Sequence, residues 1–309
     1  MNETSDFILL GFSEVLTLQH LLFVVFLLIY IITMIGNLSI IFAYRFSTEL
    51  HTPMYFFLAN FSFLEICYIS TTVPKLLSSL LLQIKFITFL GCVSQMFCFL
   101  LLGGTECYML AAMAYDRYNA ICHPLLYGII MNKRTCLGLI TISWVSGAIN
   151  SLIHTVLTFT LSFCGANTIN HFFCDIPPLL DLACSPTAMN EIVLLVACGC
   201  VIVSAFLLTI ASYVRIISAI LNIKTNSGRK KAFSTCASHL IVVTMFYGSA
   251  IFMYFRPKSS YSMNKDRLIA ALYAFIAPLF NPFIYSLRNN DVKGAVTKIL
   301  CRILVVKKY

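Results

Sequence analysis

Residues 21–44 read LLFVVFLLIYIITMIGNLSIIFAY and include no charged side chain. A helix needs about 20 apolar residues to cross the hydrocarbon core of a bilayer, so this stretch predicts a membrane-spanning helix. Six more apolar stretches follow, at approximately 54–82, 92–122, 136–160, 191–222, 233–255 and 266–287. We predict a single all-α membrane domain over residues 1–309, a bundle of seven transmembrane helices.

The composition excludes most other classes of protein. Of the 309 residues, 60% are hydrophobic and 11% are charged, whereas soluble domains carry about 25% charged residues. A soluble enzyme, a disordered chain and a nucleic-acid-binding protein are therefore set aside. The net charge of +9 bears on orientation instead, because Lys and Arg collect in cytoplasmic loops.

The distribution of basic residues sets the orientation of the bundle. With the N-terminus outside, 15 of the 21 basic residues fall on the cytoplasmic side and 6 fall outside. Residues 161–190 then form a long outer loop, and residues 288–309 form a cytoplasmic tail that begins with a short amphipathic helix. Asn2 starts an Asn-x-Thr pattern on the outer side, which makes it a candidate glycosylation site.

Four of the 13 cysteines face the outer, oxidising side. Cys92 opens the third span, and Cys164, Cys174 and Cys184 lie in the outer loop. Disulfides are expected on that side of the membrane. Four cysteines allow three pairings, and spacing alone does not choose among them.

Two carboxylates interrupt the apolar spans at one depth. Glu65 and Glu106 each lie 11 residues from the cytoplasmic end of their span, which is about 16 Å. Asn37 and Asn281 lie at about 10–12 Å by the same rise per residue. One interpretation is a hydrogen-bonded cluster that fixes helix packing. The one that we favour is a site where the two carboxylates share Na⁺ or a proton, because ionised groups inside a bilayer need a partner.

Four motifs fall in order on spans two, three, six and seven. They are LHTPMYFFL at 50–58, MAYDRY and AIC within 113–122, KAFSTC and SHL within 231–240, and PLFNPFIY at 278–285. Together they resemble the vertebrate olfactory receptors over nearly the whole chain, and HFFCD at 171–175 resembles the class II, tetrapod-type branch. Asn119 stands where that family usually has Val, and Glu65 stands where Asp is more common.

The resemblance implies a rhodopsin-like G-protein-coupled receptor in the plasma membrane, without enzymatic activity and without a cofactor other than the Na⁺ considered above. The implied partners are a small volatile odorant, a stimulatory olfactory G protein that raises cyclic AMP, and membrane lipids, with no nucleic acid. The resemblance also pairs Cys92 with Cys174 and Cys164 with Cys184.

An activation switch is implied as well, with an ion pair between Asp116 and Arg117 that holds the inactive state. Its expected members are Asp116, Arg117, Tyr118, Tyr213, His239, Tyr247, Asn281, Pro282 and Tyr285.

By resemblance, the ligand pocket lies between spans three, five, six and seven, in their outer half and above Tyr247. Helical spacing selects the candidate lining residues. They are Phe99, Leu100, Gly103 and Gly104 on span three, Ile251 and Tyr254 on span six, and Leu272 and Tyr273 on span seven. We expect the two glycines to make room by lacking bulk and Tyr254 to donate a hydrogen bond to the ligand. A mostly apolar pocket of this kind suits a small, weakly polar molecule.

A cation-coupled transporter or channel that uses Glu65 and Glu106 as a relay is the alternative from another class. The sequence shows no internal repeat of the kind that many transporters carry. A membrane enzyme is disfavoured, because the chain has neither His-Glu-x-x-His nor Gly-x-Ser-x-Gly. Flux without a cyclic AMP signal would identify the transporter.

Overall fold

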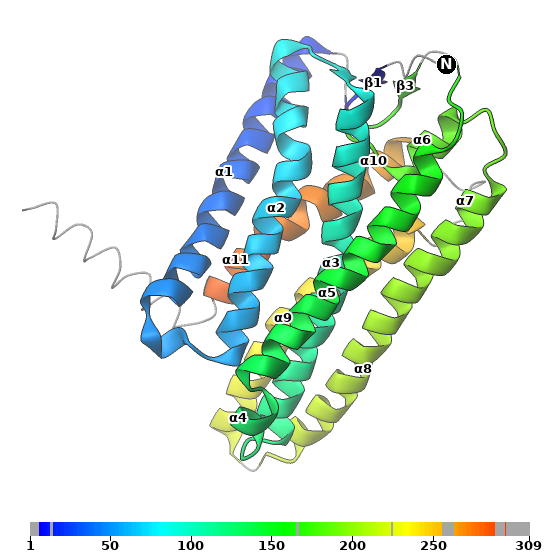
Figure 1. Ribbon diagram of the computed structural model, residues 1–309. Helices are drawn as coiled ribbons and strands as arrows, with labels where there is room; N and C mark the ends of the chain where they lie inside the picture. The colour runs from blue at the N-terminus through cyan, green and yellow to red at the C-terminus, as the bar shows by residue number, and fades with distance from the viewer. Residues whose placement is uncertain are drawn as a thin grey trace, which may run out of the picture.

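The computed structural model describes residues 6–12, 15–164, 167–223, 225–254, 263–287 and 294. Within these residues, seven helices are long and apolar enough to cross a membrane, and they pack side by side as a bundle (Figure 1). The spans are Leu16–Phe46, Pro53–Leu82, Phe89–Cys122, Lys133–Phe159, Ala188–Leu221, Cys236–Tyr254 and Arg267–Ile284. The predicted seven-helix membrane bundle is confirmed, and each predicted stretch overlaps one of these helices.

Five of the spans lie within single helices, and spans five and seven contain a π-helical turn. The single helices of the first four spans are α1 (Leu16–Phe46), α2 (Pro53–Leu82), α3 (Phe89–Cys122) and α5 (Lys133–Phe159). Span five is α7 (Ala188–Val193), the π-helical turn η2 (Leu194–Cys198) and α8 (Gly199–Leu221). Span six lies in α9 (Asn226–Tyr254), and span seven is α10 (Met263–Ala271), the π-helical turn η4 (Leu272–Ile276) and α11 (Ala277–Leu287). Short helices between the spans are η1 (Thr48–Leu50), α4 (Tyr127–Ile130) and α6 (Ile176–Leu182).

Local chemistry explains several helix ends. The Thr88 side chain accepts a hydrogen bond from Gly91 N at the start of α3, and Asn132 accepts one from Thr135 N at the start of α5. Such caps satisfy N–H groups that have no partner within the helix. α9 begins at residue 226, before the predicted start at 233. The prediction covered only the apolar stretch, and the preceding residues 226–231 are too polar for the membrane core.

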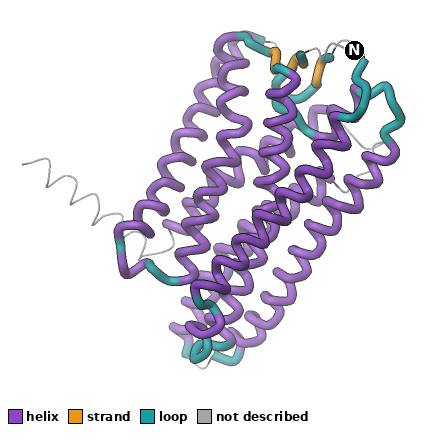
Figure 2. The backbone as a smooth tube through the Cα atoms, viewed as in Figure 1, coloured by secondary structure: helices purple, strands orange, loops and turns teal. Residues whose placement is uncertain are grey.

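A small sheet caps one end of the bundle, with strand order β2-β1-β3 (Figures 1 and 2). β1 (Phe7–Leu9) runs antiparallel to β2 (Phe86–Ile87) and parallel to β3 (Thr168–Ile169). Phe7 and Leu9 are buried beneath it. The sequence did not predict this sheet, because strands of two or three residues carry no readable alternation. The sheet joins the N-terminal segment to the loops that follow spans two and four, at one end of the molecule.

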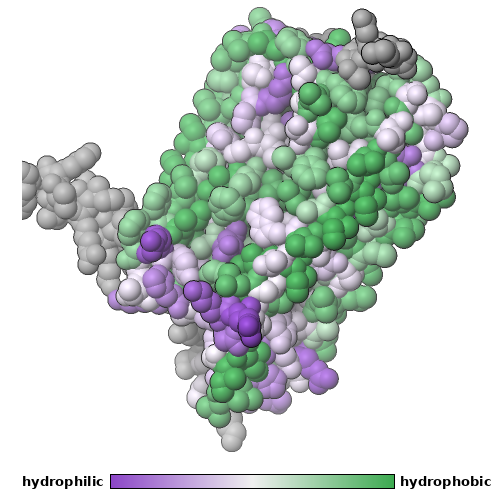
Figure 3. Space-filling model, viewed as in Figure 1, coloured by the Kyte–Doolittle hydropathy of each residue, from purple (hydrophilic) through white to green (hydrophobic). Residues whose placement is uncertain are grey.

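The bundle is apolar on its flank, and several polar side chains are buried within its mostly apolar interior. Hydrophobic side chains cover most of the visible flank (Figure 3). Large hydrophobic residues such as Ile35 and Ile142 are exposed. Buried polar side chains, among them Glu65 and Glu106, lie between the helices. α3 packs against α2, α5, α8 and α9. It is therefore the helix around which a site inside the bundle is built.

Candidate functional site

A mostly apolar cavity lies between α2, α3, α5, α9 and the segments of spans five and seven. Its volume is about 50 Å³. This is several times the roughly 10–15 Å³ that one water molecule needs. Its walls are Tyr68, Phe99, Leu100, Gly103, Gly104, Cys107, Asn150, Cys198, Val201, Ile202, Phe246, Ala250, Tyr254 and Tyr273. Such a cavity suits one small molecule with few polar groups.

Six of the eight predicted pocket residues line this cavity: Phe99, Leu100, Gly103, Gly104, Tyr254 and Tyr273. The placement of Ile251 was wrong, because its side chain is 38% exposed on the flank. On α9 the cavity wall instead runs through Phe246, Ala250 and Tyr254, one residue every four. Ile251 lies about 100° around the helix from its neighbour Ala250. Its side chain is therefore turned away from the cavity.

The placement of Leu272 was also wrong, since 52% of this residue is exposed. Leu272 begins the π-helical turn η4, and Tyr273, Ala274 and Phe275 within that turn are buried. Adjacent residues of a helix point about 100° apart. Tyr273 lines the cavity, and its neighbour Leu272 therefore does not.

The two predicted glycines have different surroundings. A Cβ atom added at Gly103 would meet only the Tyr68 ring, at 3.8 Å, so Gly103 leaves space in the cavity. A Cβ at Gly104 would lie 3.1 Å from Cα of Gly147 in α5. Gly104 therefore allows α3 and α5 to approach each other, in addition to lining the cavity.

Asp175 in the outer loop holds two tyrosines of the cavity wall. Its fully buried carboxylate accepts hydrogen bonds from Ile176 N at 2.8 Å, from Tyr254 Oη at 3.5 Å and from Tyr273 Oη at 3.4 Å. Burial raises the pKa of Asp175 to about 6, although these hydrogen bonds lower it. Because the Tyr254 hydrogen is directed at Asp175, the oxygen of Tyr254 is left as an acceptor. Donation from Tyr254 to a ligand stays a prediction.

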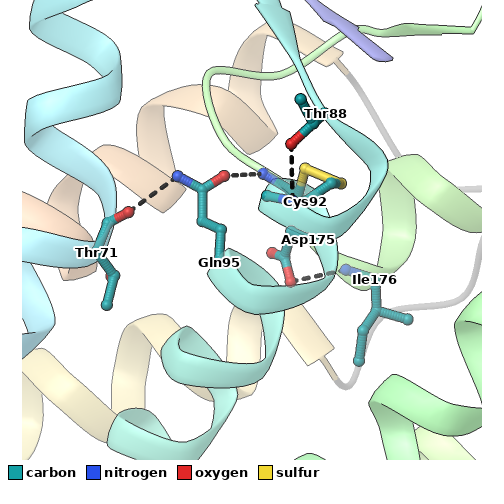
Figure 4. Close-up of a disulfide and its surroundings, with 8 residues drawn as sticks. Thr71, Thr88, Cys92, Gln95, Asp175 and Ile176 are labelled. Atoms are coloured by element: carbon teal, nitrogen blue, oxygen red, sulfur yellow. Dashed lines mark hydrogen bonds between the residues drawn. A yellow bond between two sulfur atoms is a disulfide. The ribbon is translucent and has the colours of Figure 1, made fainter. Parts of the chain in front are cut away.

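A disulfide fixes the outer loop to α3. Cys92 bonds Cys174, with Cα atoms 5.5 Å apart. Beside it, Gln95 Oε1 accepts from Cys174 N at 3.0 Å, and Gln95 Nε2 donates to a backbone carbonyl of α2 (Figure 4). Cys164 and Cys184 form the second disulfide within the loop. Both pairings are those that the resemblance implied.

The two buried carboxyl groups lie together in the core. Glu65 of α2 and Glu106 of α3 are both buried. Asn281 Nδ2 donates to Glu65 Oε1, while Oε2 of Glu65 is bonded to none of the described residues. Asn37 instead donates to the carbonyl of Thr33 in its own helix. Within the described part of the chain, no group of three or more His, Cys, Asp or Glu side chains is placed to hold a metal ion.

At the inner end of α3, Asp116 and Arg117 are both buried. Asp116 Oδ1 accepts a hydrogen bond of 2.8 Å from Tyr127 Oη, and Arg117 Nη1 donates to the carbonyl of Met113 at 3.2 Å. Tyr127, in α4, is a partner of Asp116 that the sequence did not predict. It links the inner loop between spans three and four to the expected switch.

Other expected switch residues join neighbouring helices. Tyr213 Oη of α8 lies 2.8 Å from His239 Nδ1 of α9, and both side chains are buried. Tyr247 Oη donates to the carbonyl of Cys107 in α3 at 2.8 Å. Tyr118, by contrast, contacts His123 beyond the end of its own helix, at 3.0 Å.

Pro282 packs at a close contact between α1 and α11. A Cβ atom added at Gly36 would lie 3.0 Å from the Pro282 ring, so glycine is needed there. The side chain of Tyr285, the glycosylation candidate Asn2 and the predicted amphipathic helix of the tail lie outside the described residues.

Sequence reasoning missed the polar side of the cavity. Asn150 of α5 lines it beside Cys198, and His154 contacts the same thiol. The sequence did contain an indication of this polar side, because Asn150 and His154 are polar residues inside a predicted span. Their four-residue spacing places both on one face of α5.

Comparisons with known proteins agree on one family. A family model described as olfactory receptor matches residues 26–303. Olfactory receptor 5AP2 of Mus musculus is 50% identical over 298 residues, which cover 96% of this chain and 94% of that protein. Olfactory receptor 9G4 of Homo sapiens is 51% identical over 294 residues, 95% of this chain and 90% of the relative. Olfactory receptor 8H3 of Homo sapiens is 47% identical over 303 residues, 97% of each chain.

Proposed function

The chain belongs to the olfactory receptor family, and we propose that it binds a small volatile odorant in the cavity described above and then activates a stimulatory olfactory G protein that raises cyclic AMP. As a member of that family it is a multi-pass plasma membrane receptor for odorants. The observation that carries the proposal is the mostly apolar cavity between α3, α5 and α9, beneath the disulfide-linked outer loop.

Helix α9 connects this cavity to the inner end of the bundle. Phe246 and Tyr254 line the cavity, and His239, nearer the cytoplasm, contacts Tyr213 of α8. Tyr247 lies between these sites and is bonded to α3. A displacement of α9 at the cavity is therefore transmitted to the inner end.

The proposed activation step is a movement of α9 toward α3 and α8 at its outer end. A ligand shifts the equilibrium between the inactive and active states only by its difference in affinity for them. The odorant must therefore bind more tightly to the state in which α9 has moved. Because the helix is stiff, its inner end moves outward and opens a cleft beside Arg117 for the terminal helix of the G protein. Release of Arg117 from its contacts at the inner end of α3, the carbonyl of Met113 among them, makes its guanidinium available to that partner.

A cyclic AMP assay tests the proposal directly. Cells that express the receptor with the stimulatory olfactory G protein are exposed to a broad odorant panel, and the Arg117→Ala variant is compared at equal surface expression. We expect at least one odorant to raise cyclic AMP through the wild type and not through Arg117→Ala. Cation flux without cyclic AMP would support the transporter alternative and overturn the proposal.

For the carboxyl pair we propose that Glu65 and Glu106 share a proton in the inactive state. The burial of both carboxyl groups supports a shared proton, because two neighbouring buried carboxylates cannot both stay ionised. Glu65→Gln keeps a polar partner for Glu106 and Asn281. Glu65→Leu leaves both side chains without this partner, at a cost in folding stability of roughly 1–3 kcal/mol each. We predict near wild-type surface expression with altered basal cyclic AMP for Glu65→Gln, and a severalfold loss of surface expression for Glu65→Leu.

Quantitative surface staining and basal cyclic AMP check this prediction. Replacing Na⁺ by a large organic cation should leave basal signalling unchanged. A marked response to Na⁺ removal that disappears in Glu65→Gln would instead establish a sodium site.

A further inference from the structure

One polar atom in the cavity wall has no hydrogen-bond partner among the described residues. Asn150 is 7% exposed and lines the cavity. Its Nδ2 donates to Sγ of Cys198 at 3.9 Å, while its Oδ1 is bonded to none of the residues that the structure describes. A buried acceptor without a partner is costly, about 1–3 kcal/mol. A ligand that donates to this oxygen removes that cost.

The contacts of Cys198 explain why the amide oxygen of Asn150 is left unpaired. Cys198 Sγ lies 3.3 Å from Nε2 of His154. A thiol carries a single hydrogen, and when it is given to the imidazole nitrogen, the sulfur has only acceptor capacity left. The NH₂ group of Asn150 therefore faces the sulfur, and the oxygen is left for a donor.

Two tyrosines of the cavity wall also present acceptors. Tyr254 and Tyr273 direct their hydroxyl hydrogens at Asp175, so their oxygens accept. A hydroxyl group on a ligand can donate to these acceptors, whereas a carbonyl or ether oxygen has no hydrogen to donate. Asp175 is not among the cavity-lining residues, so the walls offer no carboxylate to a cationic amine.

We propose that Asn150 makes the cavity selective for small neutral molecules that carry a hydroxyl group, which donates to Asn150 Oδ1. This inference rests on the proposed function and names its ligand class: volatile alcohols and phenols. The rest of the ligand contacts apolar side chains of the wall and occupies the open space at Gly103.

Matched pairs of odorants test the proposal. The probes are 1-hexanol, 1-octanol, benzyl alcohol and phenol, each beside its methyl ether, together with ketones and esters of similar length. The readout is the cyclic AMP dose response of intact cells. For the active pairs we expect the alcohol to be about tenfold or more potent than its ether, equivalent to about 1.4 kcal/mol. In Asn150→Leu this preference should fall to about twofold or less.

Asn190→Leu is the matched control, because Asn190 is a buried amide that bonds the carbonyl of Leu157 away from the cavity. It should keep the tenfold preference. Asn150→Ala, which removes the oxygen without adding bulk, repeats the test in case Asn150→Leu does not reach the surface. A wild type that prefers ethers, ketones or esters, or an alcohol preference that survives in the Asn150 variants, overturns this inference alone. A receptor that no odorant of a broad panel activates overturns the proposed function.

Discussion

Replacing Cys92 or Cys174 by Ser is expected to leave almost no receptor at the plasma membrane. The bond connects positions 82 residues apart and holds the outer loop against α3. Its loss releases the loop that supplies Asp175, the partner of Tyr254. Loss of a native disulfide costs typically 2–5 kcal/mol in small secreted domains, which is enough to unfold a marginally stable protein.

Surface staining of an epitope-tagged receptor measures this effect. Cys200→Ser is the matched control, because Cys200 is an exposed free cysteine of span five and its replacement should change little. Cys164→Ser should have a smaller effect than Cys92→Ser, since its bond closes only 20 residues within the loop. Normal surface levels of Cys92→Ser would contradict the structural role given to this bond.

Gly147→Leu should be equally severe, because Gly147 lies where α5 touches α3. A Cβ atom there would lie 2.4 Å from Thr105 Oγ1 and 2.5 Å from the carbonyl oxygen of Leu101. The second atom is backbone and cannot rotate away, so the two helices must separate. Overpacking costs typically about 1–3 kcal/mol and occasionally more.

Gly138 supplies the control on the same helix. A Cβ atom at Gly138 meets nothing within 4 Å, so Gly138→Leu should keep normal surface expression. Gly147→Leu should be retained inside the cell, and Gly147→Ala should have an intermediate surface level. Surface staining and the thermal stability of the purified variants provide the measurements. Equal behaviour of the two Leu variants would show that α3 and α5 do not meet at Gly147.

The fold was largely predictable from the sequence, because each membrane span needs a long apolar stretch and the chain has seven of them. Residues 21–44 alone predict a span, and the structure extends it only to Leu16–Phe46. The depth of Glu65 and Glu106 was also predictable, since helical rise is constant. The disulfide pairing was not, because it came from the family resemblance alone.

The cavity was predicted only in part, because the face that each helix turns to the cavity depends on how the helices pack. Ile251 and Leu272 each lie next to a residue of the wall, Ala250 and Tyr273, and are exposed. Gly104 was given only the role of making room, since the approach of Gly147 depends on how two helices cross. Asn150 was overlooked, although a polar side chain inside an apolar span is the same signal that identified Glu65.

Filling the cavity at Gly103 tests the central claim, that the odorant acts from this cavity, most directly. A side chain there points toward the Tyr68 ring and meets no backbone within 4 Å, so Gly103→Val should fold and reach the surface. Gly248→Val, an exposed position of α9 with nothing within 4 Å, is the matched control. The measurement is the concentration of an identified agonist that gives half-maximal cyclic AMP at equal surface expression. We expect this concentration to rise about tenfold or more for Gly103→Val and to stay unchanged for Gly248→Val. Unchanged potency in Gly103→Val would show that the odorant does not act from this cavity.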